Sequence, residues 1–157
     1  MLACDTRVTT STPIVKPLLQ LGSQGDAVKE LQTLLVRWGT YIGAIDGLFS
    51  ILVKNAVIAY QHRVFLVKDG IVGPLTWQAL EVGEPVHMPV LRQGSTGKTV
   101  LMLQRLLSTT GDYRDVIDGD FGLRTQAAVK VFQKRYGLFA NGIVRDRTWY
   151  FLSTVPH

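Results

Sequence analysis

The sequence predicts an all-α protein built from two tandem three-helix bundles joined by a short linker. Two observations favour this fold class: an internal repeat that spans most of the chain, and apolar residues at helical spacing within each copy. Residues 17–80 align with residues 89–152 without a gap, and about 27 of roughly 64 positions are identical. A long unit that occurs only twice indicates two small domains. Strand patterns are weak throughout.

The first helix of the first copy is predicted from apolar residues that recur at helical spacing. Gly39 can end this helix, because glycine readily adopts the conformation that follows a helix C-terminus. Ser23 and Asp26 resemble a capping pair three residues apart at its start. The apolar positions are Val28, Leu31, Leu34, Leu35 and Trp38.

The second and third helices follow Gly-rich turns. The second is predicted to begin after Asp46-Gly47, with Ser50 as a favourable N-cap. The third is short, and Pro74 occupies its first position, where proline is tolerated. Trp77 and Leu80 are expected to face inward. The buried positions expected in the second helix are Val53, Ala56, Val57 and Tyr60, matched in the second copy by Thr125, Ala128, Val129 and Phe132.

The domain boundaries predicted from this alignment are a flexible tail at 1–16, one repeat at 17–80, a linker at 81–88 and a second repeat at 89–157. The single cysteine, Cys4, excludes an internal disulfide. No apolar run is long enough for a membrane span. Residues 1–16 lack the basic and apolar regions of a signal peptide, so no export signal is visible.

The charge is distributed unevenly between the copies. The chain carries a net charge of +5 and has a pI near 9.6. The second copy has ten Lys or Arg against five Asp or Glu, whereas the first has five against four. This surplus favours an anionic partner, such as a wall polymer, an acidic lipid or nucleic acid. A solvated basic surface is the alternative interpretation.

An ordered set of motifs carries a family resemblance. Each copy approximates L-x-x-G-x-x-G-x-x-V-x-x-L-Q, then D-G-x-F-G-x-x-T-x-x-A-V-x-x-F-Q, then G-L-x-x-(D/N)-G-x-V-x-x-x-T-W. This series resembles the peptidoglycan-binding domain 1 family. The second copy departs at Asn141 and Arg145, where Asp and Gly are usual. The first copy departs from the motif at more positions, namely Ser50, Val53, Tyr60 and Phe65. Phe65 stands where Gly is usual.

The resemblance implies a three-helix fold that binds bacterial cell-wall glycan or peptide, and it implies no catalysis. It also implies a location in the cell envelope or outside the cell, with the cytoplasm as the alternative. The expected partner is peptidoglycan, with a wall hydrolase on another chain as a further possibility.

Six residues are candidates for contact with peptidoglycan. Tyr41 and Tyr113 follow the first helix of each copy, and an aromatic ring with a hydroxyl suits stacking on a sugar. Arg63 and Arg135 end the second helix and could bind a stem-peptide carboxylate, although a role at the helix C-terminus explains them equally well. The remaining two are Asp118 and Gln133, for which an Asx turn and a hydrogen-bonded brace are the structural alternatives.

No catalytic set is evident in the sequence. The three histidines, His62, His87 and His157, lie far apart, and no zinc-ligand spacing occurs. We therefore expect no enzyme, no metal and no cofactor. The alternatives to a wall-binding module are a protein-interaction scaffold, a basic helical protein that binds nucleic acid, and a hydrolase fragment whose catalytic partner lies elsewhere.

Overall fold

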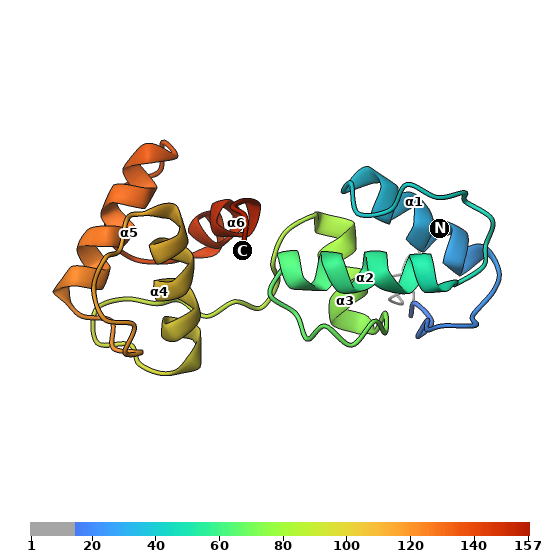
Figure 1. Cartoon of the computed structure of the whole chain (residues 1–157), viewed down its shortest axis with the longest axis horizontal. Helices are drawn as coiled ribbons and strands as arrows, with labels where there is room; N and C mark the ends of the chain where they lie inside the picture. Colours follow the sequence, from blue (N-terminus) through green and yellow to red (C-terminus); the bar gives the residue numbers. More distant parts are fainter. Residues whose placement is uncertain (1–14) are drawn as a thin grey trace, which may run out of the picture.

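The computed structural model describes residues 15–157, and these residues form two separate three-helix bodies side by side (Figure 1). No strand occurs in this part of the chain, where extended pairing is limited to isolated bridges such as Leu19 with Val72 and Leu91 with Val144. The all-α prediction is therefore confirmed. The helices are α1 (Asp26–Arg37), α2 (Ile51–Arg63), α3 (Pro74–Val82), α4 (Lys98–Thr110), α5 (Leu123–Arg135) and α6 (Asp146–Thr154).

Each repeat has its own hydrophobic core. The predicted apolar stripes of the first two helices point inward, and the tryptophans of α3 and α6, Trp77 and Trp149, are almost completely buried. Each indole N–H donates to a proline carbonyl at the start of its own repeat, Pro17 or Pro89, at 2.8 Å. The repeat closes on itself in this way, because a buried indole requires a hydrogen-bond partner.

The helix ends follow the sequence signals with one exception. The Ser50 hydroxyl accepts the Val53 N–H at 3.4 Å, and Pro74 occupies the first turn of α3. The predicted capping pair of Ser23 and Asp26 is wrong, because Gly25 is the N-cap of α1. The Ser23 hydroxyl instead accepts the Gln20 N–H at 3.0 Å and stabilises the turn before the helix.

Four glutamines brace the turns between helices, in the way that the sequence suggested for Gln133. Gln104 on α4 shows the arrangement: its side-chain oxygen accepts the Gly119 N–H at 2.9 Å. Its Nε2 lies at 3.1 Å from the Asp118 carboxylate and at 3.0 Å from the Thr125 hydroxyl. A buried amide without such partners would cost free energy of folding. The glutamine and the turn therefore stabilise each other. The other braces are Gln32, Gln61 and Gln133, each accepting the N–H of Gly47, Gly70 or Gly142.

The segment between the repeats is more structured than predicted. Helix α3 continues to Val82, so the first two residues of the expected linker are helical. Val86 packs against the first core and Met88 against the second. At the N-terminal side, residues 1–14 and with them Cys4 lie outside the described residues. Lys16, expected in the flexible tail, forms an ion pair with Glu30.

Among residues 15–157, no helix combines the length and the apolar character needed to cross a membrane.

Candidate binding site on the second repeat

Two of the six predicted site residues line one hollow on the second repeat. This hollow, about 450 Å³ in volume, lies between the loop at 111–122 and the first turn of α5. Tyr113 and Asp118 line it together with Asp115 and Arg124. A neighbouring hollow of about 380 Å³ shares Tyr113, Asp115 and Arg124. We call the surface that carries both hollows the α5 face.

An ion pair crosses the α5 face. Arg124, on the first turn of α5, pairs with Asp115, and 81% of the arginine side chain is exposed. Hydrogen bonding from Arg124, followed by the Val116 N–H, holds the pKa of Asp115 below its ordinary value. The same pair raises the pKa of Arg124. Exposed ion pairs contribute little to stability, so Arg124 can exchange this partner for another carboxylate at small cost.

Asp118 supplies an acceptor at the opposite edge of the hollow. One of its carboxylate oxygens accepts the Asp120 N–H at 2.9 Å and the Gln104 amide at 3.1 Å. These bonds, the backbone one first, lower the pKa of Asp118 and keep it ionised. Within the described part of the chain, its second oxygen accepts no hydrogen bond and is available to an N–H or O–H of a ligand.

The two tyrosines are less accessible than the sequence suggested. Tyr41 and Tyr113 are 7% and 5% exposed. The hydroxyl of Tyr41 donates to the Ala44 carbonyl at 2.7 Å, and that of Tyr113 donates to the Val116 carbonyl at 2.5 Å. The predicted stacking on a sugar does not fit this burial, because each ring covers its own core. Tyr113 lines the hollow with little of its surface exposed.

Both predicted arginines are engaged within the fold. Arg135 donates two hydrogen bonds of 2.7 Å to the Asp112 carboxylate, a bidentate arrangement that raises the pKa of Arg135. Arg63 donates to the Trp38 carbonyl at 2.9 Å, at the C-terminal end of α1. Each arginine therefore ties the end of the second helix to the end of the first. Asp112 lines the smaller hollow, whereas Arg135 lines neither hollow although 46% of its side chain is exposed.

Gln133 is buried, and its amide is occupied by the turn at 141–143. Its oxygen accepts the Gly142 N–H at 2.9 Å, and its nitrogen donates to the Ile143 carbonyl at 2.9 Å. This geometry accounts for Gln133 as a brace, and contact with a polymer would require that turn to open. A ligand role for Gln133 remains a prediction from the sequence.

Asp115 and Arg124 were missed as site residues. A signal for them existed in the repeat alignment, because the first copy has Gly43 and Leu52 at the corresponding positions. Shared residues are mostly core or turn residues, so a surface site is better sought where the copies differ in charge.

The α5 face combines groups suited to a polar peptide or an amide-bearing sugar. It offers an exposed guanidinium, carboxylate oxygens and apolar edges from Val116 and Leu123. No cluster of three His, Cys, Asp or Glu residues that could hold a metal ion occurs in residues 15–157.

Comparison with known proteins identifies the family. A family model described as "Putative peptidoglycan binding domain" matches residues 24–80 and 96–152. The chain belongs to this peptidoglycan-binding domain family. The two matches fall on the two three-helix bodies, one on each, and confirm the tandem arrangement.

Three relatives match most of the chain. It is 34% identical to the N-acetylmuramoyl-L-alanine amidase CwlM of Mycobacterium tuberculosis, over 98% of the chain and 38% of that protein. It is 33% identical to a probable N-acetylmuramoyl-L-alanine amidase of Bacillus licheniformis, over 93% of the chain and 47% of that protein. It is 32% identical to the amidase CwlL of the same organism, over 88% and 46%. The chain thus spans less than half the length of these relatives.

These relatives correct one expectation from the sequence. The missing catalytic motifs led us to expect no enzyme, but the proteins that match most of the chain are named as amidases. The relatives are more than twice as long as the chain, so the residues within these 157 positions do not by themselves decide whether the protein is an enzyme.

Proposed function

We propose that this chain binds peptidoglycan through the α5 face of its second repeat and belongs to a cell-wall hydrolase of the N-acetylmuramoyl-L-alanine amidase type. The observation that carries the proposal is the twofold match to the peptidoglycan-binding family, together with the amidase relatives. Its place of action is then the cell envelope or the space outside the cell.

The α5 face suits a stem peptide next to its sugar. Arg124 can leave Asp115 and form a charge-assisted pair with a peptide carboxylate, which is stronger than a neutral hydrogen bond. The free oxygen of Asp118 can accept an amide N–H or a sugar hydroxyl. Val116 and Leu123 offer apolar contact to methyl groups of alanine or of an N-acetyl group.

Binding to the wall would serve a hydrolase by raising its local concentration at the substrate. Two domains on one chain gain further if both reach the polymer at the same time. The basic surplus of the second repeat adds attraction to an anionic wall, and this part of the affinity falls with salt.

Co-sedimentation with insoluble peptidoglycan at low and high salt tests the binding part. Arg124→Leu places the first-copy residue type on the α5 face, and we expect a loss of affinity of about tenfold, equivalent to about 1.4 kcal/mol. Arg92→Leu is the matched control, since it removes an exposed cation outside both hollows. Equal losses in the two variants would show that only net charge matters and would refute the site.

The hydrolase part is tested with the same suspension. N-acetylmuramoyl-L-alanine amidase action leaves a new N-terminal L-alanine on each released peptide, and heat-denatured protein provides the blank. Release above the blank is expected, and no release by protein that sediments with the wall would contradict hydrolysis by this chain.

A further inference from the structure

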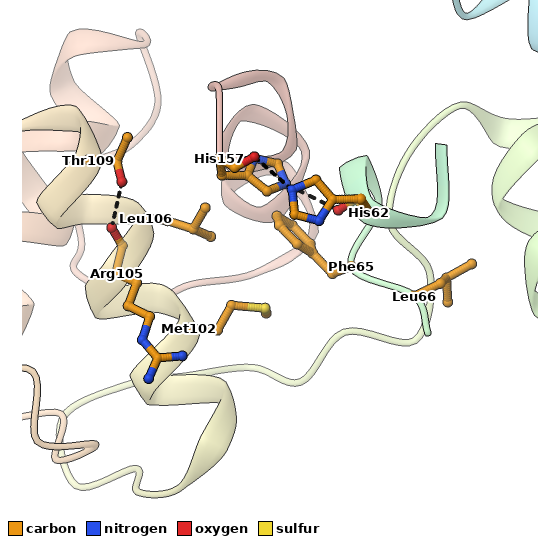
Figure 2. A pocket seen from close by; sticks show the side chains of 8 residues that line it. All are labelled: His62, Phe65, Leu66, Met102, Arg105, Leu106, Thr109 and His157. Carbon is orange, nitrogen blue, oxygen red and sulfur yellow. Dashed lines mark hydrogen bonds between the residues drawn. The ribbon is translucent and has the colours of Figure 1, made fainter. Parts of the chain in front are cut away.

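We propose that Phe65 locks the two repeats into one rigid body with a single relative orientation. Phe65 follows α2 in the first repeat, yet its ring packs against the core of the second (Figure 2). The ring meets Trp149 edge-on, with centroids 5.7 Å apart. A family match to two separate domains does not require any such contact.

The backbone conformation at Phe65 is strained, so the contact carries a conformational cost. Phe65 has a φ of 64°, a left-handed conformation that is strained for a bulky residue. The corresponding residue in the second repeat is Gly137, with a φ of 73°, and glycine adopts this conformation without strain. Glycine is therefore the unstrained residue for this turn, and the first copy has a phenylalanine there instead. Such strain persists where surrounding contacts offset it, and here the second repeat provides those contacts.

Two histidines extend the junction. The ring of His157 lies 5.1 Å from that of Phe65 and 4.7 Å from that of His62. Nε2 of His62 donates to the His157 carbonyl at 2.7 Å, and Nε2 of His157 lies 3.2 Å from the His62 carbonyl, as Figure 2 shows. Phe65 thus contacts two aromatic rings of the second repeat, those of Trp149 and His157.

The connecting segment leaves the two repeats little freedom to move relative to each other. Val86 belongs to the first core and Met88 to the second, so only His87 lies between residues anchored on opposite sides. His87 itself has a φ of 56°, and its ring lies 3.1 Å from the Gln78 side-chain oxygen. In the described residues, Phe65 and His87 are the two non-glycine residues with positive φ, and both are at the junction.

A fixed orientation has a consequence for recognition. In Figure 1, α6 faces the first repeat across the junction, so the surfaces of the two repeats keep one spacing and direction. A polymer that contacts both repeats must then present its sites at that spacing, whereas flexibly tethered domains would accept many.

Backbone ¹⁵N relaxation of the full chain tests the lock without any wall ligand, so its outcome is independent of the proposed function. The unaltered protein should show one rotational correlation time for both repeats. Phe65→Gly should replace it with shorter, separate values, approaching those of bodies half the mass. Phe139→Ala is the control, because that ring is 84% exposed and packs on neither core.

Separate correlation times in the unaltered protein would overturn the proposal, and so would a common value that survives Phe65→Gly. The variant is expected to fold, because it gives the first repeat the residue that the second already has in this turn. If it did not fold, separate correlation times in the unaltered protein would still overturn the proposal.

Discussion

The corresponding surfaces of the two repeats differ far more than their cores. Around the α5 face the second repeat carries Arg114, Asp120 and Arg124. The first repeat has exposed apolar residues at the same positions, namely Ile42, Leu48 and Leu52, and Ile42 is 99% exposed. The braces and buried stripes remain in both copies. The two copies therefore share the residues that folding requires and differ in the chemistry of their surfaces.

Substitution of the turn-bracing glutamines should give the largest difference in stability between the two repeats. Gln104 has a hydrogen-bond partner in Thr125, whereas Val53 at the corresponding position offers Gln32 none. We expect Gln104→Leu to lower the free energy of unfolding by about 3 kcal/mol and Gln32→Leu by about 2 kcal/mol, because buried turn amides lose their partners. Denaturant titration of each variant measures the difference.

Gln93→Leu is the control for volume and polarity. Gln93 is exposed, and the first copy already has a leucine there, Leu21. A loss for Gln104→Leu no larger than that of Gln93→Leu would show that the brace contributes nothing.

The arginines that end the second helices should give a smaller difference. Arg135 pairs with Asp112, whose side chain is only 4% exposed, whereas Arg63 bonds a neutral carbonyl. We expect Arg135→Ala to cost about 1–2 kcal/mol of unfolding free energy and Arg63→Ala less than about 1 kcal/mol, since removing the cation leaves a covered carboxylate unpaired. Lys134→Ala, at an exposed neighbour, should be near neutral in the same denaturation assay. An Arg135→Ala curve that overlays the Lys134→Ala curve would argue against a paired Asp112.

The smallest expected difference between the repeats is in how much stability each loses at low pH. The pKa values of Asp115 and Asp118 in the second repeat and of Asp46 in the first lie below the ordinary value of 3.8. Their stabilisation is complete above that value and is lost as the pH falls through the lowered pKa. Asp115→Asn with Asp118→Asn should therefore flatten the acid loss of stability more than Asp46→Asn does. Thermal unfolding from neutral pH to below 3.8 measures this, and equal slopes would count against it.

The sequence by itself determined the repeat, the helix order and the buried stripes. These follow from local spacing, since apolar side chains at helical intervals must share one face, and Trp77 and Trp149 take equivalent places. It also indicated the Asx turn at Asp118 and the brace at Gln133, because these residue types hydrogen-bond to nearby backbone groups.

Only the tertiary structure decided which polar residues are free to meet a ligand. Tyr113 and Gln133 suggested a binding role by residue type, yet the fold buries both and occupies their polar atoms. In the sequence, Arg124 is one of ten basic residues in the second copy. Only the structure shows that it pairs with Asp115 and lines a hollow. In the sequence, Phe65 is only a departure from the family motif. The structure shows that its ring packs against the core of the second repeat. Burial and long-range pairing depend on the whole chain, so no local pattern could have fixed them.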